Sequence, residues 1–96
     1  IFFSENFADK NMHNDKIRKK YGFSVSKDSD GVPVVSDVSS FSKIESLEIG
    51  DSIIAVNGKK TPDMTTFLKR MKIYSYKIES VIIKRGTEHY LLKPEE

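Results

Sequence analysis

The sequence contains no cysteine. This absence excludes disulfide bonds, cysteine-ligated zinc sites and thiol catalysis within the chain. Because a chain without cysteine suits a reducing or an oxidising compartment equally well, this feature does not locate the protein. The 96 residues are enough for one small domain. A domain of this size has little room for an internal active-site cavity.

Long apolar runs and a large excess of one charge are also missing. No apolar stretch approaches the ~18–20 residues of a membrane span, so we expect no membrane contact. The 16 basic and 14 acidic residues leave a net charge of +2, which gives no general reason to expect a nucleic-acid partner. A basic cluster at residues 16–20 does not change this expectation, because no aromatic platform alternates with its basic side chains.

Short apolar segments, several of them alternating with polar residues, predict a domain rich in strands. The predicted strands cover residues 23–26, 32–38, 52–56, 76–84 and 89–92. The dipeptide Asn57-Gly58 is a strong turn signal after the third of them. Residues 1–16 are predicted to be a linker or the tail of a preceding domain. Ile17 is expected at the start or end of a further short strand.

Two helices are predicted between these strands. A short one is expected after residues 39–40, because Phe41, Ile44 and Leu47 recur at a spacing of three and Gly50 can end it.

A longer helix is predicted over residues 62–72. Thr61 is the expected N-cap, and Pro62 suits a first helical position. The amphipathic pattern is set by four residues at helical spacing, Met64, Phe67, Leu68 and Met71.

The stretch from Leu47 to Gly58 resembles the most diagnostic segment of the PDZ domain family. In that family a leucine, a Gly-Asp pair, an apolar strand and Asn-Gly fall at these intervals. A second motif agrees, because residues 20–23 (Lys-Tyr-Gly-Phe) stand where the family has its carboxylate-binding loop. The resemblance covers residues 17–93 and implies an α+β domain over residues 17–96. Its fold would be a five- to six-stranded, partly open antiparallel β-barrel or sandwich, capped by one short and one longer helix.

The resemblance implies a function in peptide binding. Such domains take up an extended peptide, typically a C-terminus, as an extra strand between the strand after the loop and the longer helix. The loop amides would hold the terminal carboxylate, and Arg18 or Lys19 would assist. The peptide-binding residues implied on this sequence are Tyr21, Gly22, Phe23, Ser24, Val25, Thr66, Arg70 and Ile73. Thr66 stands where the family often has a histidine, which puts the preference for a Ser or Thr in the ligand in doubt.

A weaker resemblance concerns the two ends of the chain. Residues 81–92 are similar to bacterial PDZ domains attached to proteases, and residues 1–7 resemble the junction after a retropepsin-like aspartyl protease domain. This likeness implies that the domain recruits or presents substrate for a protease in the same parent protein, in the bacterial cell envelope or periplasm. The alternative is a structural or regulatory domain that packs in cis against the protease and has no free peptide ligand.

No pattern in the chain indicates catalysis or a cofactor. The two histidines, His13 and His89, are far apart, and no serine lies in a nucleophile-elbow pattern. Asp28 and Asp30 resemble part of a calcium loop, but no downstream glutamate has the required spacing, so a solvated turn is favoured. We therefore expect a binding module without enzymatic activity, metal or cofactor.

Overall fold

Six strands form one antiparallel sheet in the computed structural model, which describes residues 14–95. The strands are β1 (Phe23–Lys27), β2 (Pro33–Val38), β3 (Ser52–Val56), β4 (Lys59–Lys60), β5 (Val81–Arg85) and β6 (Glu88–Leu92). Their order is β1-β2-β3-β5-β6, with β4 paired to β3. The sheet does not close, because β1 and β6 are its two edges. With two helices added, this is the partly open α+β fold that the sequence predicts.

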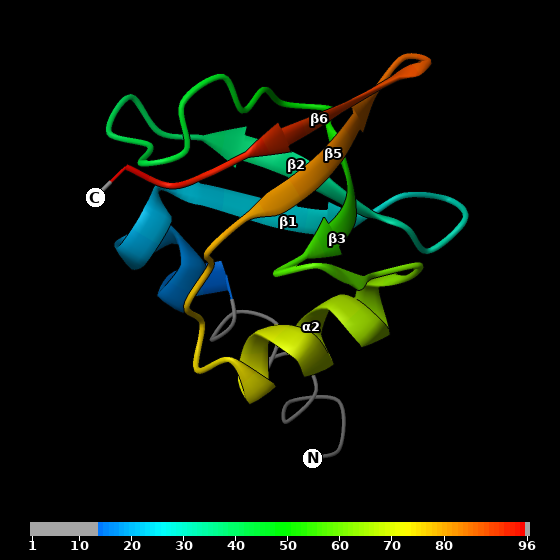
Figure 1. Cartoon of the computed structure of the whole chain (residues 1–96), viewed down its shortest axis with the longest axis horizontal. Helices are drawn as coiled ribbons and strands as arrows, with labels where there is room; N and C mark the ends of the chain where they lie inside the picture. The colour runs from blue at the N-terminus through cyan, green and yellow to red at the C-terminus, as the bar shows by residue number, and fades with distance from the viewer. Residues whose placement is uncertain (1–13, 96) are drawn as a thin grey trace.

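The two helices lie on the same side of the sheet (Figure 1). The longer one, α2 (Met64–Ile73), confirms the amphipathic prediction and buries Met64, Phe67 and Met71. Its N-cap is Asp63 rather than the predicted Thr61. The Asp63 carboxylate accepts the Thr66 amide at 2.7 Å, and hydrogen bonds from Thr66 lower the pKa of this carboxyl. Thr61 is instead buried.

The shorter helix is not where the sequence places it. Residues 41–47 form turns without a helix, with Phe41 86% exposed while Ile44 and Leu47 are buried. Serine hydroxyls bond the local backbone here, as from Ser42 to Ile44, and such bonds compete with a helix. Ser46 also adopts a φ of 71°, which ends any regular turn.

The second helix covers residues 14–21 instead. Ile17 was expected in a strand, but it lies inside this helix and is completely buried. The pair Ile17 and Tyr21, four residues apart, gives the helix an apolar face that packs into the core. The predicted division between residues 16 and 17 stays a prediction, and the helix runs across that point. The expectations for residues 1–13 lie outside the described residues.

The last predicted strand pair is shorter than expected at its start. The strand predicted from residue 76 begins at Val81, because Ser75 and Tyr76 both have positive φ. The segment between α2 and β5 makes no strand hydrogen bonds here and is held by the side chain of Asn57. Its side-chain oxygen accepts the Glu79 amide at 2.6 Å, and its side-chain nitrogen donates to the Lys77 carbonyl at 3.0 Å.

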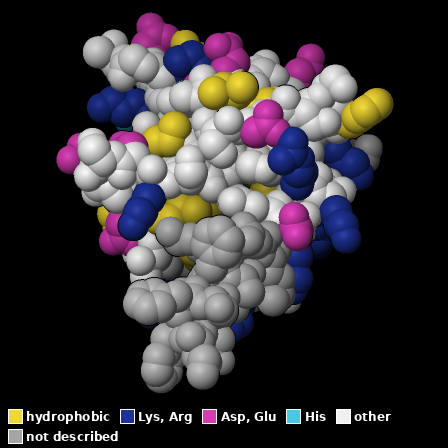
Figure 2. Space-filling model, turned by 180° about the vertical axis from the view of Figure 1, so that it is seen from behind, with side chains coloured by type: hydrophobic (Ala, Val, Ile, Leu, Met, Phe, Trp, Pro, Cys, Tyr) yellow, Lys and Arg dark blue, Asp and Glu magenta, His cyan; other side chains and the backbone are white. Residues whose placement is uncertain are grey.

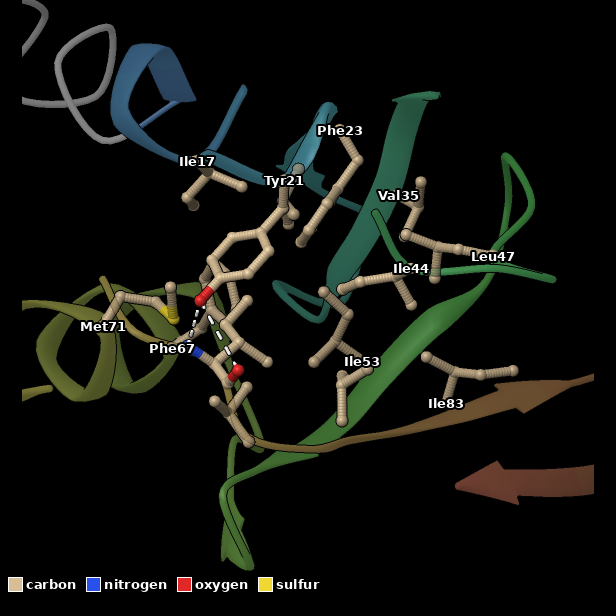
Figure 3. Packing of buried hydrophobic residues seen from close by; sticks show 14 of the residues in the cluster. Ile17, Tyr21, Phe23, Val35, Ile44, Leu47, Ile53, Phe67, Met71 and Ile83 are labelled. Atoms are coloured by element: carbon tan, nitrogen blue, oxygen red, sulfur yellow. Dashed lines mark hydrogen bonds between the residues drawn. The ribbon is translucent and has the colours of Figure 1, made fainter. Parts of the chain in front are cut away.

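The core lies between the sheet and the two helices, and Figure 3 shows its side chains converging from all of them. Tyr21 is part of this core and is only 6% exposed. Its hydroxyl accepts the Ile78 amide at 2.6 Å and lies 3.4 Å from the Ile78 carbonyl, to which it donates. This contact ties the end of helix 14–21 to the connection between α2 and β5.

A buried carboxylate organises the loop that leads into β3. Asp51 is 1% exposed, and Arg85 donates to both of its oxygens at 2.8 Å. Burial raises the pKa of the Asp51 carboxyl, but hydrogen bonds from Arg85 and the Glu48 amide, with the charge of Arg85, bring it below its usual value. Arg85 also donates to the Ser46 carbonyl, so one side chain of β5 fixes the loop before β3.

We expect Arg85→Met to destabilise the fold at neutral pH, because Asp51 would remain buried without its cation. The folded-state pKa of Asp51 lies below the unfolded value, so the stabilisation is present above about pH 4 and is lost as the pH falls through the folded-state pKa. Urea unfolding at about pH 7 and about pH 3 measures this. Lys84→Met, at an exposed position of the same strand, is the control. An equal loss for Arg85→Met at both pH values would contradict the assignment.

Tyr21→Phe should lower the free energy of unfolding by about 1–3 kcal/mol, because it leaves the buried Ile78 amide without an acceptor. Equilibrium urea unfolding tests this. Tyr90→Phe removes a hydroxyl whose partner is the exposed Glu88 and should change the stability little. Similar losses in the two variants would show that the Tyr21 hydroxyl does not have this structural role.

Candidate functional site

Strand β1 offers one edge that no other strand covers, since it pairs only with β2 in the described sheet. In an antiparallel pair, successive residues alternately face the partner strand and face away. The Val25 amide faces away, because it donates to the side-chain oxygen of Asn14 at 3.1 Å and not to β2. A hydrogen-bond donor of the main chain is thus directed at the region beside the sheet.

Helix α2 runs along β1 and is held at both ends. At its start, the Met64 amide donates to the carbonyl of Gly31, in the turn that follows β1, at 2.7 Å. Just after its end, Tyr76 lies under the ammonium group of Lys16, 4.8 Å from the ring centre. The Tyr21 contact with Ile78 holds the same end. These contacts fix α2 antiparallel to β1.

The loop before β1 is shaped by one glycine. Gly22 has a φ of +80°, and a Cβ at this position would lie 2.9 Å from the Cα of Ser42, so no other residue fits here without a shift. The Gly22 amide donates to the Arg18 carbonyl at 2.9 Å and closes helix 14–21. A carboxylate that used this amide would have to replace that bond.

The predicted pocket residues around the Gly22 loop and in β1 are part of the core. Tyr21, Phe23 and Val25 are 6%, 1% and 1% exposed, and Ser24 is also buried. They therefore form the floor beneath the β1 edge and present main-chain groups rather than open side chains to a ligand.

The three predicted helix residues share one face of α2, as their spacing of four and three requires. Thr66 and Arg70 are partly buried, while Ile73 is 64% exposed. This face adjoins the buried face of α2. Ile73 therefore exposes an apolar side chain at the C-terminal end of the helix.

Arg18 and Lys19 lie on exposed positions of helix 14–21. Arg18 forms an ion pair with Asp37 of β2 and approaches the Ser24 hydroxyl at 3.5 Å. It therefore reaches across β1, next to the predicted carboxylate loop. Lys19 is exposed near the same end.

Sequence reasoning missed Asn14 and the contact of Lys16 with Tyr76. Asn14 and Arg18 are four residues apart, as are Ile17 and Tyr21, and these spacings are the signal for a helix with one face on β1. The polar composition of residues 4–16 concealed this signal.

Two surface hollows among the described residues lie away from the path between β1 and α2. One of about 360 Å³ is lined by Tyr21, Ile78 and Pro94 with charged neighbours. The other, of about 270 Å³, lies by Val32 and Ile54. On the face seen in Figure 2, apolar side chains form small separate patches among charged ones. Neither hollow brings the predicted site residues together.

Over residues 14–95, no three His, Cys, Asp or Glu side chains gather as a metal-binding group. Within the same residues, no helix has the length and hydropathy to cross a membrane.

Comparison with known proteins agrees with the arrangement of β1, α2 and the Gly22 loop. The model of the PDZ domain family matches residues 11–75, which include these elements and the segment from Leu47 to Gly58. Searches of curated proteins and of solved structures gave no match. PDZ domains are peptide- and protein-binding modules, not enzymes. The chain belongs to the PDZ domain family.

Proposed function

We propose that this domain captures the C-terminus of a partner protein as an extra strand on the free edge of β1, alongside α2. The observation that carries the proposal is the outward-facing Val25 amide, which takes its acceptor from outside the sheet. A ligand strand would supply a main-chain carbonyl in place of the Asn14 oxygen. Main-chain bonds of this kind give affinity without dependence on the ligand sequence.

The carboxylate of the ligand would bind at the Gly22 loop. Arg18 and Lys19 place positive charge at this end, which attracts an anionic terminus. In the free domain the Gly22 amide donates to the Arg18 carbonyl. Carboxylate binding would exchange this hydrogen bond for one to a charged acceptor. Charged acceptors form the stronger bond.

A peptide with a free C-terminal carboxylate and an apolar last residue should bind about tenfold or more tightly than its C-terminally amidated form, since a hydrogen bond to a charged group contributes about 1.5–3 kcal/mol. NMR titration of ¹⁵N-labelled protein with a peptide library measures both affinity and place. Shifts are expected at residues 20–26 and along α2. Binding that ignores amidation, or shifts confined to other regions, would reject the proposal.

Asn14→Ala should strengthen peptide binding several-fold, because the ligand no longer competes with the Asn14 oxygen for the Val25 amide. The control is Asp15→Ala, which changes an exposed neighbour on the same helix. Hydrogen exchange of the Val25 amide gives a separate readout, with faster exchange expected in free Asn14→Ala than in the free parent protein. Unchanged exchange and affinity would show that the Asn14 bond does not occupy the ligand edge.

We further propose that the bound peptide is a substrate for a protease domain in the same parent protein. The support is the similarity of residues 81–92 and 1–7 to protease-attached domains. The Asn14 contact also favours a second candidate, in which a segment of the parent protein occupies the β1 edge in cis. The flanking sequence decides the first point, since an upstream Asp-Thr-Gly or Asp-Ser-Gly is expected for an aspartyl protease.

A further inference from the structure

Among residues 14–95, one arginine side chain has no carboxylate partner. The chain has three arginines. Arg18 pairs with Asp37, and Arg85 pairs with Asp51 and Glu48. The Arg70 side chain makes no hydrogen bond or ion pair within residues 14–95, although its Nε is shielded from solvent. A shielded donor without an acceptor costs free energy, and a bound acceptor would recover it.

The position of Arg70 suits contact with a ligand on β1. It lies on the same face of α2 as Thr66 and Ile73 and is partly buried. It stands three residues before the last helical residue, which is ~4.5 Å along the helix axis. An extended strand advances ~3.3 Å per residue. The guanidinium can therefore reach a side chain within the last few residues of a peptide whose carboxylate lies at the Gly22 loop.

The charges around this end of the domain favour an anionic ligand. Helix 14–21 carries Lys16, Arg18, Lys19 and Lys20 against a single acid, and α2 carries Lys69, Arg70 and Lys72 without any acid. The net charge of the whole chain is only +2, so positive charge is concentrated on these two helices. The field there would steer acidic peptides toward the site.

We infer that the partner is an acidic C-terminus, with Asp or Glu among the three residues before the terminal apolar one, and that Arg70 reads this carboxylate. The inference rests on the proposed function, in which the face of Thr66, Arg70 and Ile73 borders the ligand. Guanidinium and carboxylate form two parallel hydrogen bonds in a planar pair, so recognition depends on geometry as well as charge. A glutamine in the ligand retains the shape but loses the charge.

The probes are fluorescein-labelled heptapeptides ending in valine with a free carboxylate. Each carries one Glu at one of the three positions before valine, and a matched set carries Gln there. Fluorescence anisotropy with the 96-residue protein should show at least one Glu peptide binding about tenfold more tightly than its Gln partner, as expected for a hydrogen bond between charged groups. Raising the salt concentration should reduce this difference.

The variant Arg70→Gln should remove the preference for Glu, so that the Glu and Gln peptides bind with equal affinity. Lys72→Gln removes the same charge from a different, exposed face of α2 and should keep the preference. Arg70→Lys should restore it only in part, since an ammonium group cannot form the paired bonds. Thermal unfolding of each variant shows whether it is folded.

The outcomes separate this inference from the proposed function. If the free-carboxylate peptides bind but Glu and Gln forms are equal, or if Lys72→Gln abolishes the preference as strongly as Arg70→Gln, the role of Arg70 is rejected and C-terminal binding stands. If peptides of both sets fail to bind the parent protein and also Asn14→Ala, the proposed function itself is rejected.

Discussion

The contact of the Tyr21 hydroxyl with the main chain of Ile78 is the constraint on which the ligand side of this domain depends. It joins the residue that precedes the Gly22 loop to the segment that follows α2. At the opposite end, the Met64 amide bonds the Gly31 carbonyl. With both ends of α2 fixed, the distance between α2 and β1 is also fixed. A ligand strand beside β1 would have to fit between the two elements. The phenol ring also fills the core, so packing and geometry are held by the same side chain.

The sequence predicts the central sheet well, because its signals are local and agree with the packing. Residues 52–56 are apolar and are followed by Asn57-Gly58, both of which take positive φ in the turn to β4. The sequence predicts α2 equally well, because Met64, Phe67 and Met71 recur at helical spacing and are buried. Only the predicted N-cap is wrong. Thr61 lies in the core, where its hydroxyl donates to the Ile53 carbonyl at 3.1 Å, and Asp63 caps the helix instead.

The errors arise where tertiary contacts override local pattern. Phe41, Ile44 and Leu47 have the spacing of a helix, but the Lys43 amide bonds the Tyr21 carbonyl and Ile44 pairs with Pro94. These partners are distant in sequence, so no local pattern reports them. Conversely, helix 14–21 lies in a polar segment and is stabilised by Ile17 and Tyr21 in the core. For the candidate site, the loop motif predicts the residues of β1, whereas the unpaired side chain of Arg70 is seen only in the structure.

The bonds made by the free domain bear on how selectivity arises. Two main-chain donors of the proposed site already have acceptors, the Asn14 oxygen for Val25 and the Arg18 carbonyl for Gly22. A ligand strand would replace these bonds rather than add to them, so a neutral main-chain acceptor in the ligand would add little to the affinity. Discrimination between ligands would then come from groups that have no partner in the free domain. The described residues offer two of this kind on one face of α2, the shielded Nε of Arg70 and the exposed side chain of Ile73. A ligand that satisfies both would pair an acidic residue with an apolar one, as the proposed acidic C-terminus does.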